Sequence, residues 1–92
     1  MAIAKTIEQR ELKHLVEANA IRDVLIVAVP GDNHDTCFKV QVKYGTVEKT
    51  VGRQRGGFRL FRGLESAARY VRRDLNFARP GLDMSDYRLE AA

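Results

Sequence analysis

Apolar and polar residues alternate along the middle of the chain, which is the pattern of β-strands. In residues 36–44, every second residue from Phe38 to Tyr44 is apolar, and the residues between them are polar. This alternation predicts a half-buried antiparallel strand with a basic outer face. Residues 21–29 are almost entirely apolar and rich in β-branched side chains, which predicts a second, more central strand.

Three shorter segments extend the predicted sheet. A turn at Gly45 leads into a third strand over residues 46–53, and a glycine pair then leads into a short fourth strand over residues 58–61. After the break at Pro80, residues 83–90 contain apolar positions that could form a last strand. The pattern leaves the existence of that last strand open.

Two segments have the helical period instead. Thr6 and Gln9 have the spacing of a capping box, which predicts a helix that begins there and ends near Asn19. A second helix is predicted over residues 64–76, because its apolar residues are spaced to form one buried face. Those residues are Leu64, Ala67, Ala68, Val71 and Leu75.

Together these elements predict an α+β fold in the order α-β-β-β-(β)-α-(β). Two helices would pack on one face of a small antiparallel sheet of three to five strands. A length of 92 residues, with 45% apolar and 30% charged residues, predicts a single globular domain over residues 1–92. We expect residues 1–5 and 91–92 to be disordered.

The composition also limits the cellular locations that are compatible with this sequence. No apolar run approaches the roughly 20 residues that a membrane-spanning helix needs. The N-terminus lacks the pattern of a signal peptide, and the single cysteine excludes an internal disulfide. We therefore expect a cytoplasmic protein that has no membrane association. The predicted sheet would expose its edges, which is compatible with a homodimer.

Positive charge is concentrated in one third of the chain. Between Val47 and Arg79 there are nine basic residues and three acids, a net charge of about +6, although the whole chain carries only +4. Eight of the nine are arginines, whose planar guanidinium groups match phosphate and carboxylate geometry. This pattern points to an anionic partner and gives no comparable signal for catalysis.

The candidate binding residues are the arginines of this segment, with three lysines predicted to lie on the exposed face of the sheet as a secondary set. They would bind nucleic acid, DNA in the first instance, or they would dock an acidic protein. The alternative is a solvated surface that keeps the chain soluble. The primary set is Arg53, Arg55, Arg59, Arg62, Arg69, Arg72 and Arg73, and the secondary set is Lys39, Lys43 and Lys49.

Other chemistry has weaker support in the sequence. Asp32, His34 and Asp35 fall in one loop, but no second cluster accompanies them, so a polar hairpin loop explains them better than a metal site. Cys37 and His14 have no catalytic partner at a recognisable spacing. The sequence therefore predicts no enzyme activity, no metal site and no cofactor.

Two resemblances to known families are present. Residues 4–12, 53–56 and 61–69 resemble the small ParC-type partition-associated proteins of bacterial plasmids, and this resemblance covers most of the chain. It implies a non-enzymatic accessory role in plasmid maintenance, beside a partition ATPase and a DNA-binding protein. It implies no catalytic residues.

The second resemblance is to the double-stranded RNA-binding domain, which has the order helix, three strands, helix. The loop 31–34 and the strand after it resemble the loop beside the first strand of that domain. In that family a histidine of this loop reaches the minor groove of the RNA duplex. Gly63-Leu64-Glu65-Ser66 stands where that family carries a lysine cluster. This resemblance implies binding to an RNA duplex and is the alternative to DNA.

Overall fold

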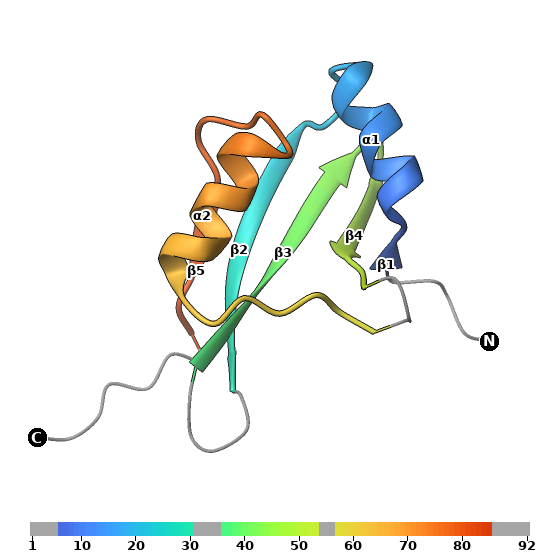
Figure 1. The fold of residues 1–92 in the computed structure, drawn as a ribbon. Coiled ribbons are helices and arrows are strands. Elements are labelled where there is room, and N and C mark those ends of the chain that lie inside the picture. Colours follow the sequence, from blue (N-terminus) through green and yellow to red (C-terminus); the bar gives the residue numbers. More distant parts are fainter. Residues whose placement is uncertain (1–5, 31–35, 54–56, 86–92) are drawn as a thin grey trace, which may run out of the picture.

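The computed structural model describes residues 6–30, 36–53 and 57–85, and these residues form a five-stranded sheet with two helices (Figure 1). The predicted α+β class is confirmed. The expected disordered ends, 1–5 and 91–92, lie outside the described residues, as do the loop 31–35 and residues 54–56 and 86–92. In chain order the elements are β1 (Thr6–Ile7), α1 (Gln9–Glu17), β2 (Asp23–Pro30), β3 (Thr36–Tyr44), β4 (Val47–Val51), α2 (Leu64–Arg73) and β5 (Gly81–Asp83).

The strands lie in the order β1-β4-β3-β2-β5. The central three strands are antiparallel, as predicted, but β1 pairs with β4 and β5 pairs with β2 in parallel. The expectation of a wholly antiparallel sheet is wrong at both edges. The reason is that α1 and α2 each carry the chain back across the same face of the sheet before the next strand begins, and such crossovers give parallel strands (Figure 1).

The core lies between the sheet and the two helices. The alternation predicted for β3 is confirmed, and its register places Val42 opposite Val24 and Val40 opposite Ile26 on the buried face. The helices complete this core with one apolar face each, and Leu15, Val16, Ile21, Tyr44 and Phe77 pack at its border. The buried residues are Ile7, Leu12, Val24, Ile26, Ala28, Phe38, Val40, Val42, Val51, Phe61, Ala67, Tyr70, Val71 and Leu75.

The start of α1 differs from the prediction, and its end agrees with it. Thr6 belongs to β1 and pairs with Thr50, so the capping-box prediction is wrong; the N-cap residue is Glu8, without a side-chain capping hydrogen bond. At the other end Asn19 has a left-handed backbone with φ of 55°. The amide of Ala20 donates to the carbonyl of Leu15 at 2.9 Å, which completes a Schellman ending.

The second helix ends at Arg73, three residues before the predicted end at Asn76. Asn76 is left-handed, with φ of 52°, and the Phe77 amide donates to the Val71 carbonyl at 3.1 Å. This reversal keeps Leu75 in the core although Leu75 lies beyond the helix. Phe77 packs at the border of the core.

Two strand predictions are wrong in detail. Residues 58–61 make only isolated bridges, from Phe58 to Gly52 and from Phe61 to Phe38, because the segment crosses the end of the sheet and does not run along a strand. The last strand begins directly after Pro80, as β5. The positions around Tyr87 that suggested a last strand lie outside the described residues.

Candidate nucleic-acid interface

Both helices begin at the same end of the molecule, the lower end in Figure 1. We call this the helix-start end. Neither the N-cap of α1, Glu8, nor that of α2, Gly63, makes a side-chain capping hydrogen bond. The amides of a first helical turn have no partner within the helix, and the helix dipole adds a partial positive charge there. Each of these ends also carries a carboxylate in its first turn, Glu11 in α1 and Glu65 in α2, which offsets the partial positive charge.

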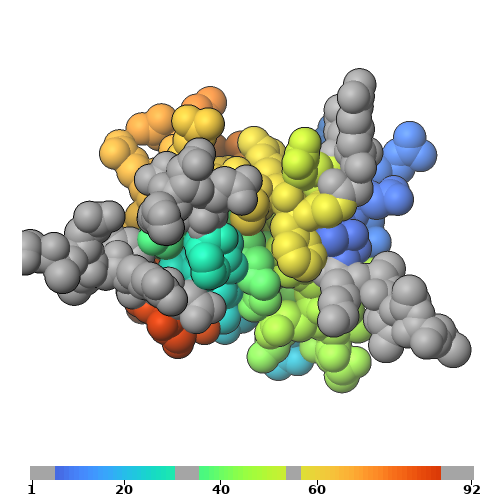
Figure 2. All heavy atoms as spheres, turned by 90° about the horizontal axis from the view of Figure 1, so that it is seen from below, coloured from blue at the N-terminus to red at the C-terminus, as the bar shows by residue number. Residues whose placement is uncertain are grey.

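Residues 57–62 cross this end (Figure 2). The Arg53 amide donates to the Gly57 carbonyl, and the Arg59 amide donates to the Val51 carbonyl, each at 3.0 Å. The Phe61 amide and carbonyl then exchange two hydrogen bonds of 2.8 Å with Phe38. These bonds fix the predicted strand-turn-strand around Gly57 to β4 and to the start of β3. They also make Arg53 and Arg59 diagonal neighbours on one side of the pairing.

Arg59 is held in place by two aromatic rings on the helix side of this segment. Its guanidinium carbon lies 5.0 Å from the centroid of the Phe61 ring and 4.7 Å from that of Tyr70. The two rings are themselves 5.1 Å apart. Such cation–π contacts restrict the guanidinium group without neutralising its charge. Arg59 is thus an ordered cation at the surface, and it lies on the same side of the segment as Phe61.

The buried side chain of Tyr70 lies beneath Arg59. Its side chain is only 6% exposed, and its hydroxyl oxygen has no hydrogen-bond partner among the described residues. Burial raises the pKa of Tyr70 above its usual value of 10.0, and the neighbouring Gln9 and Arg59 side chains act in the opposite direction. The sequence analysis did not place Tyr70 in the core. Its position three residues after Ala67 was the signal that could have done so.

Phe58 points to the other side of the segment, toward the face of the sheet that the helices leave uncovered. The Lys39 ammonium group lies 4.9 Å from the centroid of its ring. Phe58 is 39% exposed and Leu60 is 50% exposed. An aromatic ring and an aliphatic side chain are therefore accessible beside the cations of the helix-start end.

The three lysines predicted to share the exposed face of the sheet do not all lie there. Lys39 and Lys43 alternate with the buried residues of β3 and do lie on that face. Lys49 pairs with Val42, so it lies on the helix side, and its prediction is wrong. The reason is the two-residue period of β4, which places Lys49 on the same side as Val51. Lys43 faces Glu48 at 4.0 Å.

The arginines of α2 are separated from this end. Arg72 and Arg73 lie in the last turn, where their charge also favours the negative end of the helix dipole. A helix of ten residues is about 15 Å long, so these two residues lie roughly that far from the start of α2. Arg69 pairs with Glu65 at 3.1 Å. The structure thus brings Arg53, Arg59 and Arg62 to the helix-start end, and Arg55 lies outside the described residues.

Ion pairing distinguishes these groups further. Among the residues that the structure describes, Arg53, Arg59 and Arg62 make no salt bridge with a carboxylate, whereas Arg69 and Lys43 each make one. The helix-start end therefore carries arginines that make no salt bridge within the described part of the chain.

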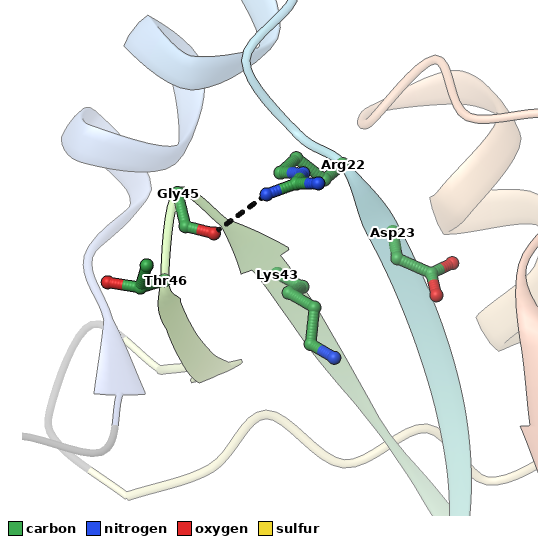
Figure 3. Close-up of a pocket in the computed structure, with 5 residues that line it drawn as sticks. All are labelled: Arg22, Asp23, Lys43, Gly45 and Thr46. Atoms are coloured by element: carbon green, nitrogen blue, oxygen red, sulfur yellow. Dashed lines mark hydrogen bonds between the residues drawn. The ribbon is translucent and has the colours of Figure 1, made fainter.

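A polar cavity of about 470 Å³ lies at the opposite end of the sheet, lined by Arg22, Asp23, Lys43, Gly45 and Thr46 (Figure 3). Its cations are engaged: Arg22 donates to the Gly45 carbonyl at 3.3 Å, and Lys43 faces Glu48. The Asp23 carboxylate adds a negative charge to the lining. This cavity is consequently a poorer anion site than the helix-start end.

Comparison with protein-family models, with curated proteins and with solved structures finds no match. Within the described residues, no helix is long and apolar enough to cross a membrane. The same residues contain no group of three or more potential metal ligands. The loop with Asp32, His34 and Asp35 lies outside them.

Proposed function

We propose that this domain binds DNA through its helix-start end, as a non-enzymatic accessory protein. The observation that carries the proposal is Arg59, which is held against two aromatic rings and makes no salt bridge within the described residues, with Arg53 beside it. Arginine side chains and helix N-termini are the groups that most often contact phosphate oxygens.

A polyanion fits this surface better than a small anionic ligand does. Arg59 and Arg62 belong to residues 57–62, which cross the end of the molecule (Figure 2), and neither lines the polar cavity at the opposite end. A chain of phosphates would contact several of them at once, and each contact would release a condensed counterion. Phosphate contacts carry no sequence information, so this surface would bind DNA without strong sequence preference.

An acidic protein is the second candidate partner, and the exposed Phe58 and Leu60 favour it. Aromatic and arginine side chains dominate the binding energy of protein interfaces. In that case Arg53 and Arg59 would pair with carboxylates in place of phosphates.

The biological setting follows from the resemblance to ParC-type proteins. It would place the protein in the cytoplasm of a bacterium, in plasmid partition, beside the partition ATPase and the DNA-binding protein. The short edge strands β1 and β5 leave free backbone groups that could pair two copies as a homodimer. The resemblance to the double-stranded RNA-binding domain makes duplex RNA the alternative nucleic acid.

The test is fluorescence anisotropy of labelled duplex DNA and duplex RNA, titrated with the protein over a salt series. We expect binding to DNA whose logarithm of affinity falls linearly with the logarithm of salt concentration. Tighter binding to duplex RNA would favour the alternative resemblance. Absence of binding to any nucleic acid at low salt would refute the proposal and direct the search to acidic proteins.

A further inference from the structure

We infer that the helix-start end takes a single-stranded segment of nucleic acid and that Phe58 stacks against one of its bases. This inference rests on the proposed function and goes further, because it specifies the form of nucleic acid and names a residue that contacts a base. Neither Phe58 nor Lys39 is needed for electrostatic attraction to a duplex through the arginines.

The first observation is the exposure of Phe58 in a segment that otherwise buries its aromatic residue. Phe61, three residues later, is 8% exposed and belongs to the core, whereas Phe58 is 39% exposed. Burial of a phenylalanine side chain stabilises a fold, so an accessible ring forgoes part of that stabilisation. Phe58 is therefore only partly covered by the described residues, and the accessible part of its ring is free to contact a ligand.

The second observation is the chemistry around the ring. Lys39 lies 4.9 Å from the ring centroid, and the neighbouring Arg59 is ordered on the other side of the segment. Proteins that bind single strands combine cations that follow the backbone with aromatic rings on which bases stack. Residues 57–62 present both features along one short stretch, so a base on Phe58 would leave its flanking phosphates near Lys39 and Arg59.

The third argument concerns the partner. In a duplex the bases are stacked on one another and paired, so their faces are not available to a ring on the protein surface. A single strand offers those faces, and stacking tolerates any base because every base has a π-face. An acidic peptide would also pair with the cations, but it offers a flat face to Phe58 only where it carries an aromatic side chain, whereas every base of a single strand offers one.

The test compares four proteins with three labelled oligonucleotides. The proteins are the wild type, Phe58→Ala, Phe58→Tyr, which keeps a stacking ring, and Leu60→Ala, which removes a comparably exposed apolar side chain two residues away. The oligonucleotides are a single strand, an abasic single strand of the same length, which keeps the phosphates and lacks the bases, and a duplex. Anisotropy is measured at one fixed low salt concentration, and circular dichroism checks that each variant is folded.

We expect Phe58→Ala to weaken binding to the single strand by at least about fivefold, the lower range for loss of one stacked base. Its binding to the abasic strand and to the duplex should be unchanged, and Phe58→Tyr and Leu60→Ala should bind all three as the wild type does.

Three results would overturn the inference, and they differ from one another. Equal affinity of Phe58→Ala and the wild type for the single strand would remove the stacking contact but leave the proposed electrostatic binding in place. A loss of equal size with the duplex, or with Leu60→Ala, would show that Phe58 acts through the structure of the segment. No binding of the wild type to any oligonucleotide would refute the proposed function itself, and an acidic protein would then be the partner to test.

Discussion

Cations occur at both ends of this small sheet, but their surroundings differ. At the end that carries the β3–β4 turn, Lys43 faces Glu48 and Arg22 donates to the Gly45 carbonyl. At the helix-start end, Arg59 is held by two aromatic rings and pairs with no carboxylate in the described part of the chain. The comparison shows that the number of basic residues is a poor guide to a binding surface. The better guide is whether their charge is already neutralised and whether their side chains are ordered.

The largest expected effect is a difference in folding stability between alanine variants of the two phenylalanines in residues 57–62. Phe61 is buried against Tyr70 and its ring supports Arg59, so Phe61→Ala should lower the free energy of unfolding by about 3–5 kcal/mol. Phe58→Ala should lower it by less than about 1 kcal/mol, since this ring is partly exposed. Urea denaturation followed by circular dichroism measures both values. Equal losses would contradict the assignment of Phe61 to the core and Phe58 to the surface.

The next effect is a difference in the salt dependence of DNA binding between variants of two pairs of arginines, Arg53 with Arg59 and Arg72 with Arg73. The double variant Arg53→Ala/Arg59→Ala should lose two phosphate contacts, and the slope of log affinity against log salt should fall by about 2. The charge-matched control Arg72→Ala/Arg73→Ala should change the slope less, because these side chains lie in the last turn of α2 and not on residues 57–62. Identical slopes for the two variants would mean that charge acts without regard to position.

A smaller effect concerns Tyr70 and pH. Burial raises the pKa of Tyr70, so the folded protein holds this proton more tightly than the unfolded chain does. Its contribution to stability is therefore complete below pH 10 and is lost as the pH rises above 10. Tyr70→Phe should weaken this loss of stability at high pH, and at neutral pH its stability should differ from that of the wild type by less than about 1 kcal/mol, since the hydroxyl lies near the Gln9 and Arg59 side chains but makes no hydrogen bond of good geometry with the described residues. Denaturation midpoints at pH 7 and above pH 10 test both expectations, and a parallel decline of the two proteins would argue against them.

The smallest effect concerns the ion pair on α2. Arg69 and Glu65 are both largely exposed and are spaced i, i+4, so Glu65→Gln should cost only about 0.3–0.5 kcal/mol, and less at high salt. Thermal denaturation at low and high salt measures this cost. A loss above about 1 kcal/mol would show that the pair has a structural role that its exposure does not suggest.

The sequence predicted those strands and helices that are long enough for the spacing of their apolar residues to repeat several times. The nine residues of β3 and the apolar run of β2 gave clear strands, and the apolar spacing of α2 gave a helix. The edge strand β1 was missed, and the last strand was expected over residues 83–90 and not at β5, because these strands have two and three residues, too few to show a period. Thr6 was misread for a related reason, since its pairing with Thr50 is a long-range contact that local spacing does not reveal.

The candidate site was predicted in its composition but not in its arrangement. The arginine-rich segment was evident from residue types, and the alternation around Phe61 placed Arg59 on the same side. The separation of Arg72 and Arg73 from Arg59 depends on the direction in which α2 crosses the sheet, which no local pattern encodes. Lys49 is a different case, because its spacing of two from Val51 already indicated the helix side of β4.

The most direct test of the central claim is to map the DNA-binding surface by nuclear magnetic resonance. Backbone amide shifts of the labelled protein would be followed as DNA is added at low salt. We predict that the largest changes fall on residues 57–62 and on the first turns of α1 and α2, whereas Gly45, Thr46 and the last turn of α2 change little. Largest changes around the β3–β4 turn, or spread evenly over all arginines, would contradict the assignment of the interface to the helix-start end.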